Sequence, residues 1–108
     1  MNILGSEWTY EYIAFEEDET PVPGVGGYCD FTAKRIVVYE PPAETNVRHP
    51  EVVVKEATRH EVIHAYLFES GLGEEMNCER GHDEQIIDWF AKQYPKIKKT
   101  YEELGVAE

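Results

Sequence analysis

The hydrophobic and polar positions change their period near the middle of the chain, and the first half has the pattern of strands. Residues 8–15 (WTYEYIAF) are aromatic and partly alternating, which predicts a β-strand. After an acidic connection rich in proline and glycine, residues 28–40 predict a β-hairpin with its turn at 32–34. The second strand of this hairpin, Arg35 to Glu40 (RIVVYE), is dense in β-branched residues, and Pro41-Pro42 ends it.

The second half of the chain has the period of helices. Apolar positions recur at spacings of three and four from Pro50 to about Ser70, which predicts a long helix. Pro50 suits the first turn of this helix, and Gly71 or Gly73 supplies its end. Because the strands precede the helices in the chain, the order predicts an α+β fold and not an alternating α/β fold.

A second helix is expected to begin near Asp83. Its apolar stripe consists of Ile86, Ile87, Phe90 and Ala91. Pro95 is expected to break this helix, since proline disrupts a helix interior, and a short third helix is expected from Lys96 to Leu104. The overall prediction is a single domain, residues 1–108, in which a short N-terminal antiparallel sheet precedes the helices.

Charge and composition exclude several classes of partner. The chain has 108 residues and a formal net charge of -12, from 22 acidic and 10 basic residues. Binding a phosphate backbone needs a concentrated basic surface, so nucleic acid is not an expected partner. No apolar run approaches the roughly 18–20 residues of a membrane span, and the start, MNILGSEW, lacks the pattern of a secretory signal. Cys29 and Cys78 form neither a CxxC motif nor a disulfide framework, so we expect a cytoplasmic protein with no membrane partner.

The stretch RHEVIHAY, from Arg59 to Tyr66, carries the strongest chemical signal. Positions i and i+4 lie on one face of an α-helix, so His60 and His64 can both turn a ring nitrogen toward one ion. Zinc takes nitrogen ligands at about 2.0–2.1 Å, and this spacing offers two of them without backbone strain. Glu61 flanks the ion and can take a proton from a water that zinc activates, so it is the candidate general base.

A catalytic zinc site needs a third protein ligand, and three candidates follow the motif: His82, Asp83 and Glu84. Glu84 is preferred because it begins a helical stretch in which Asp88 follows one turn later. Asp88 can then accept the outer N–H of a ligand histidine and fix its tautomer. The competing interpretation is a surface helix with solvated histidines. The apolar residues around the two motif histidines disfavour it, because a buried imidazole pair needs partners.

Two helices carrying these residues resemble a known family. HEVIH on one helix, followed 20 residues after His64 by E-x-x-x-D on a second, resembles the gluzincin branch of zinc metallopeptidases. The resemblance implies a small zincin-like domain with Zn²⁺ as its cofactor. It implies His60, His64 and Glu84 as ligands, Glu61 as the general base and Asp88 as the support of a ligand histidine. The stretch EQIIDWFA is also similar to the glutamate-bearing helix of short metallopeptidases of phages and mobile elements, including the type that cleaves a repressor.

The same resemblance implies further roles. In this family an edge strand above the active-site helix holds the substrate backbone, and Arg35–Tyr39 is the expected counterpart. A histidine or tyrosine often donates to the developing oxyanion, and His82 and Tyr66 are the candidates here. We therefore expect a zinc-dependent endopeptidase that acts on a protein or peptide. Two other classes stay open: a zinc-bound interaction module or phage regulatory protein that acts by binding a partner, and a metal-dependent amidase or deaminase of a small molecule.

Overall fold

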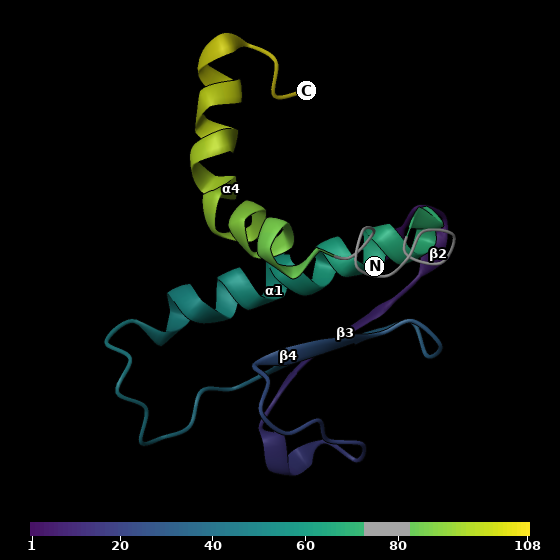
Figure 1. Ribbon diagram of the computed structural model, residues 1–108, viewed down its shortest axis with the longest axis vertical. Coiled ribbons are helices and arrows are strands. Elements are labelled where there is room, and N and C mark those ends of the chain that lie inside the picture. Colours follow the sequence, from purple (N-terminus) through teal and green to yellow (C-terminus); the bar gives the residue numbers. More distant parts are fainter. Residues whose placement is uncertain (73–82) are drawn as a thin grey trace.

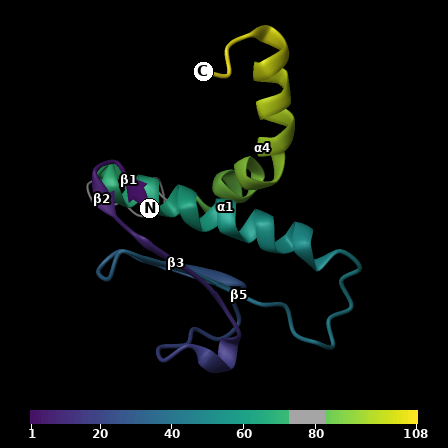
Figure 2. The same ribbon diagram turned by 180° about the vertical axis from the view of Figure 1, so that it is seen from behind.

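A computed structural model describes residues 1–72 and 83–108 (Figure 1). Its elements, in chain order, are β1 (Asn2–Ile3), β2 (Ser6–Glu7), β3 (Thr9–Ile13), a short 3₁₀ helix η1 (Phe15–Glu17), β4 (Gly27–Asp30), β5 (Arg35–Tyr39), α1 (Pro50–Glu69) and α4 (Glu84–Leu104). The strands precede the helices, which confirms the α+β class. In both views α1 lies between the strands on one side and α4 on the other, so the elements form three layers (Figures 1 and 2).

The strands form two small sheets. β1 and β2 pair antiparallel as an N-terminal sheet. The main sheet has the strand order β3-β5-β4, and β4 and β5 are the two antiparallel strands of the predicted hairpin. The pairing of β3 with β5 is parallel, so the main sheet is mixed. Local pattern predicted the strands but not this parallel pairing, which joins segments far apart in the sequence.

The place of β5 corrects one expectation. Arg35–Tyr39 was expected to be an edge strand, and this is wrong, because β5 has a neighbour on each side. Its apolar run explains the central position: Ile36, Val37 and Val38 are each at most 1% exposed, so both faces of the strand are covered. Consequently β3 and β4 are the two edges of the main sheet.

One face of the main sheet packs against α1. The buried cluster there consists of Ile3, Trp8, Ile36, Val38 and Ala65. Ala65 has no exposed surface and directly follows His64, so α1 is packed on the sheet directly beside the second histidine of the motif. α1 ends as predicted, because Gly71 adopts a φ of 83°, the left-handed conformation that stops a helix. Over the two described ranges, neither helix is long and apolar enough to cross a membrane.

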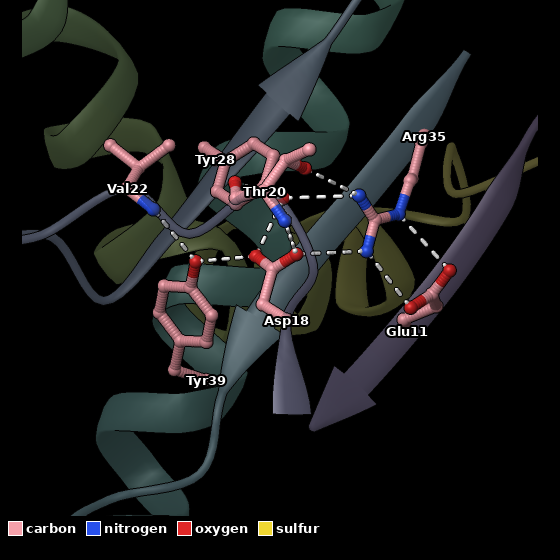
Figure 3. A network of polar contacts seen from close by, with 7 residues as sticks. All are labelled: Glu11, Asp18, Thr20, Val22, Tyr28, Arg35 and Tyr39. Atoms are coloured by element: carbon pink, nitrogen blue, oxygen red, sulfur yellow. Dashed lines mark hydrogen bonds and ion pairs between the residues drawn. The ribbon is translucent and has the colours of Figure 1, made fainter. Parts of the chain in front are cut away.

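The opposite face of the sheet is covered by the connection between β3 and β4, which a buried carboxylate holds in place (Figure 3). Asp18 accepts hydrogen bonds from the hydroxyls of Tyr39 at 2.6 Å and Tyr28 at 2.7 Å. It also accepts one from Arg35 at 3.3 Å, and Arg35 donates two more to Glu11. The hydrogen bond from the Tyr39 hydroxyl is the main reason why the pKa of Asp18 lies well below its ordinary range; burial opposes it, and the bonds from Tyr28, Thr20 and Arg35 add to it. This network ties the loop to all three strands, and thereby fixes β4.

Replacing Asp18 with asparagine is expected to weaken the acid dependence of stability. The folded-state pKa of Asp18 lies below its ordinary value of 3.8. Its stabilising contribution is therefore complete above that pH and is lost as the pH falls through the folded-state pKa. Urea unfolding measured at pH values from about 6 down to about 3 gives the number of protons taken up on unfolding. At about pH 3 this number should be about one lower for the variant than for the wild type. Glu19→Gln, at an exposed position two residues from η1, is the control; equal acid dependence in wild type and Asp18→Asn would contradict the role of the network.

The second helix begins as predicted but does not end where expected. Asp83 is its N-cap, and its side chain accepts from the amides of Gln85 and Ile86. The expectation that Pro95 breaks the helix is wrong, because α4 continues to Leu104 and includes the predicted third helix. Both views show α4 changing direction partway, with its C-terminal half leading away from the rest of the protein (Figures 1 and 2). A bend of this kind is the usual effect of an interior proline.

Candidate metal centre

The middle of α1 places both motif histidines against α4. The Nε2 atoms of His60 and His64 lie 3.2 Å apart. Both side chains are largely buried, with 16% and 11% of their surface exposed. Two ligands of a tetrahedral zinc ion, each about 2.0–2.1 Å from the metal, are separated by about 3.4 Å. The spacing of the two nitrogens therefore suits two ligands of one ion, as the i, i+4 relation predicts.

Glu84, the first residue of α4, brings a carboxylate to these nitrogens. Its two oxygens lie 2.9 Å from His60 Nε2 and 2.7 Å from His64 Nε2. One ligand atom from each residue can be chosen so that all three lie within 4.8 Å of one another. Two imidazole nitrogens and one carboxylate oxygen are a donor set that binds a divalent metal ion and leaves a coordination position open. The group His60, His64 and Glu84 can thus hold a metal.

The structure describes one of the other two candidates for the third ligand. Asp83 uses its carboxylate as the N-cap of α4, where it accepts hydrogen bonds from two backbone amides at 3.0 and 3.1 Å. His82 lies outside the described residues. Of the two described candidates, Glu84 is the one that lies against the histidines.

Asp88 lies one turn after Glu84 and faces the outer ring nitrogen of His60. Its Oδ1 is 3.7 Å from His60 Nδ1, which is longer than a direct hydrogen bond. Its Oδ2 pairs with Lys92 Nζ at 2.9 Å, an i, i+4 contact along α4. Asp88 is therefore on the side of the ring where a carboxylate can orient a metal-binding histidine.

Glu61 is buried beside this group, with 9% of its surface exposed. Burial raises the pKa of Glu61 to about 7; the charge of His60 opposes this rise and the Glu84 carboxylate adds to it. A carboxylate whose pKa lies near neutrality is matched to general-base chemistry at neutral pH. The placement agrees with the helical geometry, in which the residue after the first histidine flanks the ligands.

The edge strand β4 forms the wall of the groove across from α1. A groove of about 400 Å³ runs between Gly27, Tyr28 and Cys29 on one side and the histidines with Glu61 on the other. Sequence reasoning assigned this wall to β5 and missed β4. The signal for it was the pair of glycines that precedes Tyr28: a Cβ atom on Gly27 would lie 2.6 Å from the carbonyl oxygen of Val37, so only glycine fits here without displacement.

Tyr66, one of the two candidates for an oxyanion donor, is not among the residues that line this groove. Tyr66 lines a different groove, of about 540 Å³, together with Phe90 and Tyr94 between α1 and α4. Tyr66 lies two positions after His64, which places it about 200° around the helix at the usual 100° per residue. His82 again lies outside the described ranges.

Comparisons with other proteins add no relative. No model of a known protein family matches the chain, and no curated protein and no solved structure is significantly similar to it. The function is therefore inferred from the residues of the site and their geometry.

Proposed function

We propose that the protein is a zinc-dependent endopeptidase that hydrolyses a protein or peptide substrate. The observation that carries this proposal is the convergence of His60, His64 and Glu84 beside the buried carboxyl group of Glu61. Two nitrogen ligands, one carboxylate ligand and an adjacent base are the protein groups that zinc peptidase chemistry requires. The same groups support the resemblance to gluzincins, in a chain small enough for a minimal member.

The positions of these side chains assign each of them a role in peptide hydrolysis. His60, His64 and Glu84 would hold the zinc ion, which when bound would supply Lewis acidity toward a carbonyl oxygen and lower the pKa of a water molecule to about 7. Glu61 accepts the proton of the attacking water and returns it to the leaving amine. Asp88, 3.7 Å from His60 Nδ1, would accept the proton of that nitrogen after a small approach and so favour the tautomer that leaves Nε2 free to act as a ligand.

The free edge of β4 is suited to hold the substrate backbone. Tyr39 donates its amide proton to the carbonyl of Gly26 at 2.9 Å. Hydrogen-bonded pairs alternate along antiparallel strands, so the backbone groups of Gly27 and Cys29 point away from β5. No strand in the described part of the chain pairs with that side of β4. An extended peptide can add there as a further strand, directly over the histidines.

An apolar pocket beside the groove suggests what side chain the peptide carries. It has a volume of about 360 Å³ and shares Val53 and Ala57 of α1 with a second groove, of about 470 Å³, that reaches His60 and Glu61. Its other walls include Phe15, Val38 and Val54. A peptide lying along β4 can place a large apolar side chain in this pocket, which would stabilise the complex by removing apolar surface from water.

Metal removal tests the proposal. Protein stripped with a chelator should not cleave a broad peptide library, and adding back one equivalent of Zn²⁺ should restore cleavage. Mass spectrometry of the products gives the cleavage positions, and these should favour sites next to large apolar residues. Mg²⁺ is the matched control, because it prefers oxygen ligands and octahedral geometry and should restore nothing. Protein that is fully zinc-loaded and still cleaves no peptide would contradict the peptidase proposal.

One observation favours a second candidate, a zinc-bound module that acts by binding a partner. Two of the side-chain donors that line the grooves beside Glu61 are Tyr28 and Lys92, and both are engaged elsewhere. The hydroxyl of Tyr28 donates to Asp18 at 2.7 Å, and Lys92 pairs with Asp88 at 2.9 Å. Loss of one donor to a developing oxyanion can slow a reaction by about 10²–10³-fold. A protein with this fold and weak catalysis would then act by binding a partner along β4.

A further inference from the structure

A single hydrogen bond from Arg59 joins the two helices that carry the metal group. Its Nε donates to the backbone carbonyl of Ala91 on α4 at 2.6 Å. Ala91 has no exposed surface, so its carbonyl is buried in the seam between α1 and α4, and the bond as a whole is partly buried. A charged donor to a buried carbonyl makes a strong hydrogen bond, because water does not compete for the acceptor.

Pro95 explains why this carbonyl is available. In an α-helix the carbonyl of residue i accepts from the amide of residue i+4, so Ala91 would normally accept from residue 95. Proline has no amide proton, and its ring pushes the carbonyl of the residue four positions earlier out of line. The carbonyl that Pro95 cannot satisfy is the one that Arg59 reaches.

This bond is close to the metal group on both helices. On α1, Arg59 directly precedes His60. On α4, Ala91 follows Asp88 by less than one turn and follows Glu84 by two turns. The contacts of His60 with Glu84 and Asp88 therefore lie next to the Arg59–Ala91 bond across the same seam. A rotation or slide of α4 that breaks one set of contacts must also disturb the other.

We propose that Arg59 and Pro95 together form a clamp that sets the position of α4 on α1 and so presents Glu84 to His60 and His64. Arg59 is a positioning residue, since it touches the carbonyl of Ala91 and no member of the metal group in the contacts described above. Pro95 contributes by withholding an amide proton, which keeps the acceptor open for the guanidinium. The metal-binding part of this inference rests on the proposed zinc site.

A double-mutant cycle tests the clamp. The variants are Arg59→Met, which keeps an apolar stem but removes the donor, Pro95→Ala, which supplies an amide proton to Ala91, and the double variant. In the wild-type background Arg59→Met should weaken Zn²⁺ binding by about 10–100-fold, as losses outside the ligand set do. In the Pro95→Ala background the same change should alter affinity by no more than about twofold, because Arg59 has then lost its acceptor. Affinity is measured by competition with a chromophoric chelator.

Two further measurements separate positioning from a general loss of structure. The visible absorption of Co²⁺-loaded protein reports coordination geometry and should change in Arg59→Met but not in Arg48→Met, the control at an exposed arginine. Urea unfolding of the metal-free proteins should show the same coupling between positions 59 and 95. Equal weakening by Arg59→Met in both backgrounds, or none in the wild type, would overturn the clamp. If the wild type itself binds no zinc, the metal site is refuted instead, and the unfolding cycle alone decides whether Arg59 and Pro95 are coupled.

Discussion

Replacing Glu61 with glutamine is expected to abolish peptide cleavage while metal binding and the fold are retained. Glutamine has nearly the same shape as glutamate but cannot accept the proton of an attacking water. General-base catalysis contributes about 10²–10⁴-fold, so kcat should fall by that factor with little change in zinc content. The measurement is a single-turnover cleavage assay on zinc-loaded wild type and variant, with metal content determined on the same samples.

Glu56→Gln is the matched control for this experiment. Glu56 is also on α1 and lines the second groove, of about 470 Å³, together with His60 and Glu61. It lies four residues before His60 and is only partly buried. Its replacement should change kcat by a few-fold at most, through the field of one lost charge. Equal activity of Glu61→Gln and wild type would refute the role of Glu61. Should the biological effect of the protein survive Glu61→Gln while cleavage is lost, the interaction module becomes the better account.

Replacing His64 with alanine is expected to remove the metal and the stability that the metal confers. Binding to the folded state alone stabilises by about 2.7 kcal/mol when free metal exceeds its Kd by about a hundredfold. For a domain of this size that corresponds to a rise in Tm on the order of 10–20 °C. Added Zn²⁺ should raise the Tm of the wild type by this amount and leave that of His64→Ala unchanged, as measured by thermal unfolding with and without metal.

His49 offers a matched control, since it is a histidine just before α1 with 69% of its side chain exposed. His49→Ala should bind zinc as the wild type does. Equal zinc content in wild type and His64→Ala would contradict the metal centre. Comparing Glu84→Gln with His82→Ala then identifies the third ligand, and only the former should lose most of the metal if Glu84 is that ligand.

Local pattern was sufficient for the parts of this protein that depend on neighbours in the sequence. The spacing of His60 and His64 puts two nitrogens on one helix face, because the period of the α-helix is the same wherever the helix packs. The start of α1 at Pro50, its stop at Gly71 and the N-cap at Asp83 follow from local backbone chemistry. The α+β class follows from the order of the elements in the chain.

Contacts between segments far apart in the sequence could not be predicted from local pattern. The parallel pairing of β3 with β5 puts β5 in the centre of the main sheet and makes β4 the edge beside the histidines. The local pattern of the strands does not show whether β4 or β5 is at the edge. Pro95 was expected to end α4 because proline removes a hydrogen bond from a helix, but Arg59 on the other helix, 32 positions before Ala91, donates to the Ala91 carbonyl that proline leaves open. Partners of this kind are set by packing and not by periodicity.

In the candidate site, too, some features follow from the sequence and others only from tertiary packing. The two candidate ligands and the candidate base lie within five consecutive residues, so the sequence alone is enough to propose His60, Glu61 and His64. Glu84 was one of three candidates until the packing of α4 on α1 placed its oxygens 2.9 and 2.7 Å from the two histidine nitrogens. The burial that raises the pKa of Glu61 to about 7 is likewise a property of the assembled layers. A helix determines which residues share its face, and only tertiary packing determines what that face meets.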